Sequence, residues 1–331
     1  MRQVLIPRTG GPEVLQVREI PDPECKPGEV RVRVRAAGVN FADVMARVGL
    51  YPDAPKLPAV MGYEAAGEID QPRERAGERV MAMTRFGGQS ELLCVPADRV
   101  VPIPARLGFA EAASIPVVWL TAWHMLVELA HLRRGHTVLI HAAAGGVGTA
   151  ALQICKKFGA RTIGTASPGK HARLREMGLD HAIDYRKDDF EPRVREITGG
   201  RGVDVALDPL GMFAKSFRCL AQVGRLIMYG ASQVLPDEKR NPLKVAAAVL
   251  KMPIFHPLKL LPDNKGIFGV NMGKLWGEQD LLGPELREVL KGFESGEFKA
   301  VVDAEIPFAE ARRAHERLQS RQNFGKVVLV P

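Results

Sequence analysis

A short cluster of small residues in the middle of the chain has the spacing of a phosphate-binding turn. The apolar run at 138–140 predicts a buried strand, and an apolar-periodic helical segment follows the cluster. Between them, Ala143-x-Gly145-x-x-Gly148 keeps the second and third glycines of the dinucleotide-binding fingerprint and has alanine for the first. Such a turn lets a pyrophosphate approach the N–H groups at a helix start. We therefore predict a dinucleotide site, the alternative being a tight turn without a ligand.

The residues after the second strand of this pattern distinguish between the two nicotinamide cofactors. A site for NADH has Asp or Glu at the end of that strand, where the carboxylate binds the adenosine ribose hydroxyls. Here the strand at 162–165 is followed by no acid until Glu176. Ser167 and Lys170, with Arg173 one helical turn further on, suit a 2′-phosphate. NADPH is therefore favoured over NADH, the alternative being an ordinary loop with a solvated lysine.

Histidines and cysteines do not have the spacing of a metal site. The eight histidines form no His-Glu-x-x-His motif, and His124 and His131, seven apart on an expected helix, lack a third ligand. The four cysteines are far apart and form no Cys-x-x-Cys pair. No nucleophile elbow or paired-carboxylate pattern is present either. We expect no metal, no disulfide framework and a reducing, intracellular compartment.

The composition is that of a globular protein with about two domains. The 331 residues are 46% hydrophobic and 25% charged, and no run approaches the roughly 18 consecutive apolar residues of a membrane helix. The first residues are typical of a strand rather than of a signal peptide. The net charge of +8 is dispersed, and the aromatic content of 6% is low for a base-stacking surface. An anionic cofactor or substrate explains this charge better than a nucleic-acid partner does.

Two patterns of secondary structure position the candidate residues. Residues 1–104 contain many short strands separated by Pro and Gly, such as 29–35 with its alternating valines, which predicts a compact β-barrel or sandwich. Residues 109–130 predict two helices. From His136 onward strands alternate with helices, which predicts a doubly wound parallel sheet with right-handed crossovers. The expected strands of this sheet are 138–140, 162–165, 182–184, 203–207 and 226–229.

Beyond residue 232 the pattern loosens. The expected elements are a helix at 237–251, a sixth strand at 267–271, further helices at 285–293 and 308–320, an extended stretch at 301–307 and a final strand at 327–330. Lys244 and Lys251 would share one face of the first of these helices, ahead of an apolar-rich stretch. A basic amphipathic helix of this kind can bind an anionic membrane surface, although it more often closes a cleft or packs at a subunit boundary.

Several separated motifs resemble one enzyme family. They are Gly38-Val-Asn-Phe-Ala-Asp43, Met61-Gly-Tyr-Glu-Ala-Ala-Gly67, Glu111-Ala-Ala-Ser-Ile-Pro116, Thr121-Ala-Trp123 and the turn from His141 to Thr149. These residues are similar to the zinc-independent quinone oxidoreductase branch, the zeta-crystallin-like enzymes, of the medium-chain dehydrogenase/reductase superfamily. The stretches 239–276 and 323–330 look most like the vesicle amine transport protein-like subgroup of that branch.

The resemblance implies a GroES-like β-barrel catalytic domain at 1–120, a Rossmann domain at 121–262 and a return to the catalytic domain at 263–331. It also implies NADPH in the cleft between the domains, and a homodimer. Zinc-dependent relatives carry Cys and His where this chain has Asn40 and Tyr63, and their four-cysteine lobe has no counterpart here. The resemblance therefore agrees with the absence of metal-ligand spacing.

The same resemblance implies roles for individual residues. Asn40 and Tyr51 match positions that line the quinone or enone pocket, where Asn40 would hydrogen-bond a substrate carbonyl and Tyr51 would form a wall or donate a proton. The residues expected to bind the cofactor are Thr121, Ala144, Gly145, Gly146, Val147, Thr165, Ser167, Lys170, Tyr185, Gly230, Ser232, Phe268, Val270 and Asn323. Among these, Ser167, Lys170 and Tyr185 would hold the 2′-phosphate and the adenine.

We therefore expect a cytoplasmic NADPH-dependent oxidoreductase that reduces quinones or α,β-unsaturated carbonyls by hydride transfer. Proximity to the cofactor and polar groups such as Asn40 would lower the barrier. The alternative is a non-catalytic NADPH-binding adaptor at a membrane or vesicle surface, which the basic segment at 239–260 motivates.

Overall fold

The structure, a computed structural model, describes residues 1–232, 247, 250 and 252–331. These residues form two compact units. The first unit consists of Met1–Leu120 and Met272–Pro331, and the second consists of the described residues from Thr121 to Asn271. The sequence analysis expects the first domain to end at residue 120 and the second at residue 262. The second unit continues to Asn271, because the strand β14 (Gly266–Gly269) extends its sheet.

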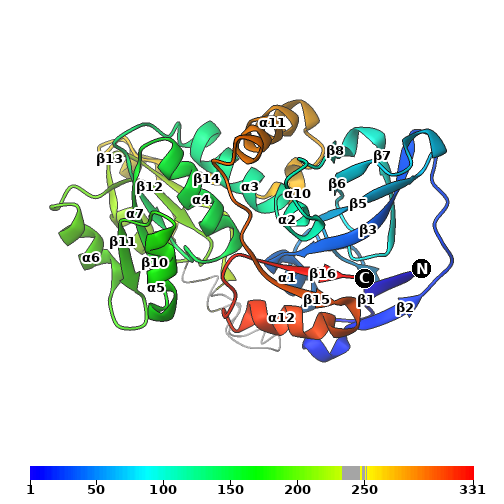
Figure 1. The fold of residues 1–331 in the computed structure, drawn as a ribbon. Helices are drawn as coiled ribbons and strands as arrows, with labels where there is room; N and C mark the ends of the chain where they lie inside the picture. Colours follow the sequence, from blue (N-terminus) through cyan, green and yellow to red (C-terminus); the bar gives the residue numbers. More distant parts are fainter. Residues whose placement is uncertain (233–246, 248–249, 251) are drawn as a thin grey trace. The chain divides into compact units, whose positions relative to one another are not determined.

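The first unit is rich in antiparallel strands, as the density of short strands predicts (Figure 1). Over the described residues, one sheet has the order β15-β16-β3-β5-β6-β8 with β7 paired to β3, and a smaller sheet has the order β2-β1-β4. The strands are β1 (Arg2–Ile6), β2 (Gln16–Glu19), β3 (Glu29–Val39), β4 (Ala59–Val60), β5 (Glu64–Gln71), β6 (Arg79–Met83), β7 (Leu92–Pro96), β8 (Val100–Pro102), β15 (Val302–Pro307) and β16 (Lys326–Val330). The mixed fold class, with a GroES-like barrel and a Rossmann unit, is confirmed.

Strand β3 shows how an alternating sequence builds the barrel. Val30, Val32 and Val34 are buried in one core cluster, whereas the arginines between them are not. These arginines reach the neighbouring strand, where Arg31 donates to Asp70 Oδ1 at 2.8 Å. Because side chains alternate between the two faces of a strand, the valines face the core and the arginines face away from it.

The last strand of the chain completes the barrel unit. β16 pairs antiparallel with β3, with Val327 opposite Val39, and parallel with β15. Val4 from β1 lies in the same buried cluster as Val39 and Val327. The first and last strands of the chain therefore share one core, and residues near 326 are brought to the end of β3.

The helices of the first unit include those expected at 285–293 and 308–320. They are α1 (Phe41–Arg47), α2 (Phe109–Ala113), α10 (Met272–Leu275), α11 (Gln279–Ser295) and α12 (Ala311–Gln319), with short 3-10 turns η1 (Pro12–Val14), η2 (Arg73–Arg75), η3 (Ala97–Arg99) and η7 (Phe308–Glu310). α12 packs against α1 and against both C-terminal strands.

A helix that begins as α3 (Pro116–Trp123) continues as a π-helical stretch, η4 (His124–Leu129). His131 lies beyond the end of this stretch, with a positive φ of 47°. The expectation that His124 and His131 lie on one helix is therefore wrong, because the backbone leaves the helix before His131.

The second unit contains a six-stranded parallel sheet, counted over the described residues (Figure 1). Its order is β11-β10-β9-β12-β13-β14, so the strand order reverses between β9 and β12, where open sheets of this kind bind ligands. The strands are β9 (Thr137–Ile140), β10 (Arg161–Ala166), β11 (His181–Asp184), β12 (Val203–Asp208), β13 (Leu220–Met228) and β14 (Gly266–Gly269). The predicted parallel sheet and its sixth strand are confirmed.

Helices connect the strands of this sheet. They are α4 (Gly146–Lys157), α5 (His171–Glu176), α6 (Phe190–Ile197), α7 (Phe213–Arg218) and α9 (Pro257–Leu260), with the 3-10 turn η5 (Pro168–Lys170). α4 packs on β9 and β10, and α7 packs on β12 and β13. The structure describes only residues 247 and 250 of the helix expected at 237–251, so Lys244 and Lys251 lie outside the described residues. In the described part of the chain, no helix is long and apolar enough to cross a membrane.

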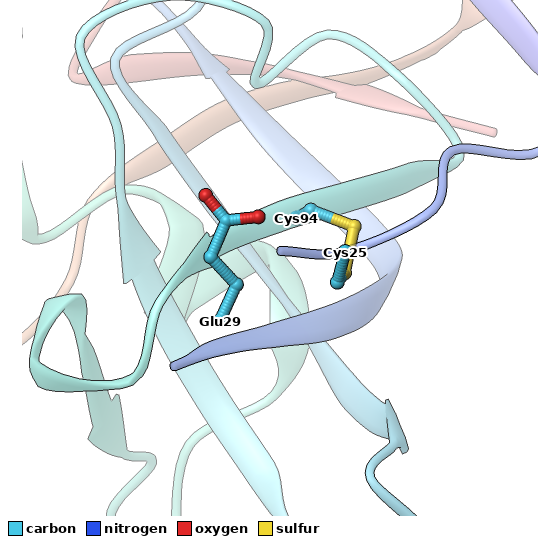
Figure 2. Close-up of side chains that lie close together, drawn as sticks. All are labelled: Cys25, Glu29 and Cys94. Carbon is cyan, nitrogen blue, oxygen red and sulfur yellow. A yellow bond between two sulfur atoms is a disulfide. The ribbon is translucent and has the colours of Figure 1, made fainter. Parts of the chain in front are cut away.

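Cys25 and Cys94 form a disulfide, with their Cα atoms 5.4 Å apart (Figure 2). The expectation of no disulfide is therefore wrong. Cys25 precedes β3 and Cys94 lies on β7, and the pairing of these two strands joins cysteines that are 69 residues apart. The disulfide removes one reason for expecting a reducing compartment. Cys155 and Cys219 are free and buried.

Candidate active site and dinucleotide-binding turn

The predicted phosphate-binding turn connects β9 to α4. The strand is buried throughout, and the chain turns at Ala142, whose φ is 51°. Gly145 donates its N–H to the Ala142 carbonyl at 2.8 Å and caps α4 in an extended conformation. Ala144 is buried, whereas Gly146 and Val147 are partly exposed at the helix start. Because the first N–H groups of a helix have no acceptor within it, this end suits a pyrophosphate.

Two glycines let the backbone of this turn pack closely. A Cβ atom on Gly148 would lie 2.5 Å from the carbonyl oxygen of Ala143 and 2.6 Å from that of Ala142. Ala143, at the position of the missing first glycine, is buried, and a Cβ on Gly164 of β10 would lie 2.9 Å from its methyl group. The glycine on the neighbouring strand therefore makes room for the alanine in the turn.

A buried polar network lies behind the turn. His141 Nδ1 is 3.0 Å from Thr165 Oγ1, and its Nε2 is 3.2 Å from Ser216 Oγ, which donates to Asp208 Oδ2 at 2.7 Å. Burial lowers the pKa of His141, so the neutral imidazole is favoured. The hydroxyl of Thr165 thus contacts this histidine, and its proposed contact with the cofactor remains a prediction.

The loop after β10 contains the residues expected to select the cofactor. Ser167 precedes the turn η5, Lys170 ends it, and both side chains are partly exposed. Tyr185 follows the next strand, β11, and is 38% exposed. Since Ala166 pairs with Asp184 in parallel register, Ser167 and Tyr185 lie at the same edge of the sheet.

The remaining cofactor candidates of the second unit follow its outer strands. Gly230 and Ser232 come after β13, and the Ser232 N–H bonds to the Pro209 carbonyl after β12. Phe268 lies on β14, and Val270 follows it and donates its N–H to the Met228 carbonyl at 2.8 Å. The parallel sheet thus collects these residues at its carboxyl edge. Thr121 is buried within α3, and Asn323 belongs to the first unit, where its Nδ2 donates to the Gly325 carbonyl at 2.9 Å.

Asn40 lies in a buried ionic network of the first unit. Lys326 Nζ donates to Asn40 Oδ1 at 2.5 Å and lies 2.5 Å from Glu64 Oε1. Asn40 Nδ2 donates to the same Glu64 oxygen at 3.1 Å. The Glu64 side chain is 0% exposed and that of Lys326 is 4% exposed. Buried ions of this kind need both a counter-ion and hydrogen bonds, and here Asn40 connects the two charges.

The strand registers explain how these three residues meet. β3 ends at Val39, directly before Asn40, and β16 begins with Lys326 beside it. Glu64 begins β5, the neighbour of β3 on its other side. A Cβ atom on Gly38 would lie 2.4 Å from Glu64 Oε1, so the glycine leaves the space that this carboxylate occupies. Three segments far apart in the sequence converge at one end of the sheet.

Asp43 extends the network beneath Asn40. Its Oδ2 accepts from the Asn40 N–H at 2.8 Å and from Gln89 Nε2 at 3.2 Å. Burial raises the pKa of Asp43 to about 7, and the backbone hydrogen bond from Asn40 and the Lys326 charge act in the opposite direction. Near neutral pH this carboxyl is therefore partly protonated, while its bond to the backbone fixes the start of α1.

Tyr51 and Tyr63 form an aromatic group in the same unit. Their rings are in edge contact with centroids 6.4 Å apart, and Phe86 packs on Tyr63 at 5.4 Å. Burial raises the pKa of both tyrosines, so each phenol keeps its proton. A protonated phenol can donate a hydrogen bond through its O–H group.

Sequence reasoning missed Glu64, Lys326 and Asp43 as members of the site. All three lie in motifs that carry the family resemblance, around Asn40, Tyr63 and Asn323. Glu64 and Lys326 carry opposite charges, and each begins a buried strand. A charge in that position needs a partner, so these two residues could have indicated a buried ion pair. The partner itself was not visible, since 262 positions separate residues 64 and 326 in the sequence.

Both units of the chain are similar to known protein families. The model described as "Alcohol dehydrogenase GroES-like domain" matches residues 26–105, and the one described as "Zinc-binding dehydrogenase" matches residues 177–329. The synaptic vesicle membrane protein VAT-1 homolog of Rattus norvegicus is 38% identical over 325 residues, which are 96% of this chain and 80% of that protein. The chain belongs to the zinc-independent, VAT-1-like branch of the medium-chain dehydrogenase/reductase superfamily.

Other members of the superfamily are similar along almost their whole length. A quinone oxidoreductase of Pseudomonas aeruginosa is 35% identical over 97% of both chains. The solved structure of the Escherichia coli quinone oxidoreductase complexed with NADPH has a TM-score of 0.87 and 30% identity, and each chain covers 100% of the other. The similarity of this medium-chain dehydrogenase/reductase to these proteins therefore extends over both units.

Proposed function

We propose that this medium-chain dehydrogenase/reductase is an NADPH-dependent oxidoreductase that reduces quinones or α,β-unsaturated carbonyls by hydride transfer. The observation that carries the proposal is the glycine turn at the start of α4, followed by a loop at 167–170 that has a lysine and no carboxylate. The relatives named quinone oxidoreductase, one of them solved with NADPH, support the same reaction class.

The second unit contains the groups that suit this cofactor. NADPH supplies the hydride when it is bound. The start of α4 would hold the pyrophosphate, and Ser167 and Lys170 would bind the 2′-phosphate through a hydroxyl and an ammonium group. Tyr185, which is partly exposed beside them, would cover the adenine. Further contacts are proposed for Thr121, Thr165, Gly230, Ser232, Phe268 and Val270, and for Asn323 of the first unit.

The first unit contains the groups proposed for the substrate oxygen. Lys326 fixes the oxygen of Asn40, so the amide NH₂ is oriented in one direction. One of its two hydrogens bonds to Glu64, and we propose that the second donates to the substrate carbonyl. This bond strengthens as hydride addition places negative charge on the oxygen. Tyr51, whose phenol stays protonated, would form a pocket wall or supply a proton.

A direct assay tests the reaction. The full-length protein is mixed with NADPH and a panel of quinones and enones, and the nicotinamide absorbance is followed. We expect turnover with members of one of these classes and much weaker turnover when NADH replaces NADPH. Absence of NADPH oxidation with every acceptor, in a protein shown to bind NADPH, would contradict the catalytic proposal.

The cofactor preference has its own test. Lys170→Glu replaces the proposed partner of the 2′-phosphate and should weaken NADPH binding at least about tenfold, while NADH binding changes little. Lys156→Glu, at the opposite end of α4, makes the same charge change and should leave both affinities unchanged. Equal weakening of NADPH and NADH binding by Lys170→Glu would show that the lysine does not recognise the 2′-phosphate.

Four exposed apolar side chains that lie near one another in the sequence favour a second candidate function, the membrane-associated adaptor. Leu250, Ile254, Leu258 and Leu261 are 86%, 93%, 68% and 68% exposed, and relatives carry the name synaptic vesicle membrane protein. Exposed leucine and isoleucine clustered in sequence are typical of contact surfaces. Co-sedimentation with anionic liposomes, abolished by Ile254→Glu and Leu258→Glu together, would support this function. Cell fractionation distinguishes the proposed cytoplasmic enzyme from a membrane-bound adaptor.

A further inference from the structure

Cys25, Glu29 and Cys94 form a group of metal-binding residue types in the first unit (Figure 2). One ligand atom from each of the three side chains lies within 4.8 Å of the other two. In the described part of the chain, this is the one such group of three His, Cys, Asp or Glu residues. All three side chains are partly exposed, so solvent, reductants and ions reach them.

Strand pairing holds two members of the group, Glu29 and Cys94, together independently of the disulfide bond. Glu29 is the first residue of β3, and it pairs with Pro96 of β7. Cys94 lies on the same stretch of β7, opposite Arg31. Cys25 lies four residues before Glu29, in a segment without regular structure that is rich in proline. Pairing of β3 with β7 therefore keeps Glu29 and Cys94 close when the sulfur–sulfur bond is open. Cys25 stays near them because its neighbour Lys26 accepts a hydrogen bond from the Glu29 N–H at 3.0 Å and donates its own N–H to Glu29 Oε2 at 2.9 Å.

We propose that the reduced Cys25 and Cys94 thiols, together with Glu29, form a binding site for a thiol-seeking divalent cation, with Zn²⁺ as the expected ion. The two sulfurs and one carboxylate oxygen provide three ligands, and water completes a tetrahedron. Ligand atoms around tetrahedral zinc lie roughly 3.5 Å apart, so the three side chains need only small rotations. Two soft sulfur ligands favour zinc over magnesium or calcium, which prefer oxygen ligands only.

The redox state of Cys25 and Cys94 determines whether this site can bind zinc. An external dithiol attacks one sulfur of the Cys25–Cys94 bond, and its second thiol releases the mixed disulfide, so the dithiol is oxidised by two electrons and the two cysteines become thiols. Zinc binding then releases the two thiol protons. The oxidised pair has no thiolate, so the disulfide form should not bind the ion. Zinc should therefore occupy this site only when the two cysteines are reduced.

Neighbouring charges are compatible with a bound cation. Arg31, opposite Cys94, donates to Asp70 at 2.8 Å, so its charge is already paired with a carboxylate. The Glu29 Oε2 atom accepts from the backbone N–H of Lys26 at 2.9 Å, which leaves its other oxygen for the metal. Glu24 and Lys26 flank Cys25 as exposed residues of opposite charge.

Zinc titration of the full-length protein tests the proposal. The protein is reduced with a dithiol, freed of it without oxygen, and titrated with Zn²⁺ in competition with a chromophoric chelator. We expect one zinc per reduced chain at this site and none at the oxidised chain. Cys25→Ser and Cys94→Ser should each weaken binding at least about 100-fold, and Glu29→Gln about tenfold.

A matched control uses the two buried thiols. Cys155→Ser with Cys219→Ser should keep the zinc affinity of the wild type, because these cysteines lie outside the group. Comparing oxidised and reduced wild-type protein requires no substitution, so the outcome does not depend on how a variant folds. Equal zinc binding in the two redox states, or unchanged affinity in Glu29→Gln, would overturn the proposal.

Discussion

Lys326 is the residue that neutralises the completely buried carboxylate of Glu64. Asn40 bonds to both charges, so its position depends on the pair. A buried ion pair contributes little net stability compared with apolar residues of the same size, but removing one partner leaves an unpaired buried charge. The pair therefore has its main effect on the orientation of Asn40, the proposed donor to the substrate oxygen.

Lys326→Met should lower the free energy of unfolding by about 3 kcal/mol or more, because it leaves Glu64 buried without its counter-ion. Adding Glu64→Gln to this variant should recover part of the loss. Urea unfolding of wild type, Lys326→Met, Glu64→Gln and the double variant measures the coupling energy between the two residues. Arg35→Met, which breaks the exposed pair of Arg35 with Glu68 on the adjacent strand, should cost less than about 1 kcal/mol. Similar losses in the buried and exposed variants would contradict this interpretation.

Asp43 and His315 should give opposite pH dependences of stability. Burial raises the pKa of Asp43 from 3.8 to about 7, so its contribution is fully present below pH 3.8 and is lost as pH rises toward 7. Burial lowers the pKa of His315 from 6.5 to about 3, so its contribution is present above pH 6.5 and is lost as pH falls toward 3. Between about pH 4 and 6.5 the two effects oppose each other.

Substitution of Asp43 or of His315 should leave only the pH dependence of stability that comes from the other residue. Relative to wild type, Asp43→Asn should gain stability with rising pH by about 1.4 kcal/mol per pH unit between pH 4.5 and 6.5. His315→Phe should show the reverse slope. Urea unfolding at these two pH values measures both slopes, and parallel profiles for wild type and Asp43→Asn would rule out the raised pKa of Asp43.

At the scale of elements, the start of α4 depends on Gly148. Gly148→Ala places a Cβ atom 2.5 Å from the Ala143 carbonyl oxygen, so the helix must move away from the turn. We expect a loss of about 1–3 kcal/mol in the free energy of unfolding, typical of overpacking, and weaker NADPH binding. Gly277→Ala has no heavy atom within 4 Å of the added Cβ and should change neither. Thermal unfolding and NADPH titration of both variants test the expectation.

The segment before β3 is joined to β7 by the Cys25–Cys94 disulfide, which closes a loop across 69 residues. In the chain-entropy description, such a cross-link stabilises the folded state by about 4 kcal/mol, and measured values are commonly about 2–4 kcal/mol. Reduction in the presence of a chelator should therefore lower the unfolding midpoint in urea. The Cys25→Ser, Cys94→Ser double variant should show the lower midpoint with or without reductant.

At the scale of the whole molecule, the second unit's sheet ends in β14 over the described residues. An edge strand has backbone N–H and C=O groups on one side that no neighbouring strand pairs. A second copy of the chain can pair with this edge about a twofold axis, which is the commonest symmetry of oligomers. We propose that the homodimer implied by the family resemblance uses this edge.

Light scattering of the purified full-length protein should give the mass of two chains. Amide hydrogens of β14 should exchange more slowly in the dimer than at dilutions where the chain is monomeric, whereas those of β11, at the other edge, should not change. A monomer at all concentrations, or protection that spares β14, would contradict the proposed arrangement.

The amino-acid sequence by itself determined the local elements and their order. The alternating valines of β3 predict a half-buried strand, and the strand–turn–helix around Gly145 and Gly148 predicts the dinucleotide turn. The missing acid after β10 predicts a preference for NADPH in the same way, and this preference stays a prediction. These features depend on neighbours within a few residues, so periodicity and turn chemistry are sufficient to find them.

Only the tertiary structure decided which distant side chains meet. Asn40, Glu64 and Lys326 converge because β16 and β5 pair on either side of β3, and Cys25 meets Cys94 because β3 pairs with β7. Strand pairing and register follow from the packing of the whole core, and the spacing of residues along the chain does not contain that information. The physical reason for the missed ion pair and the wrongly excluded disulfide is the same: both are long-range contacts.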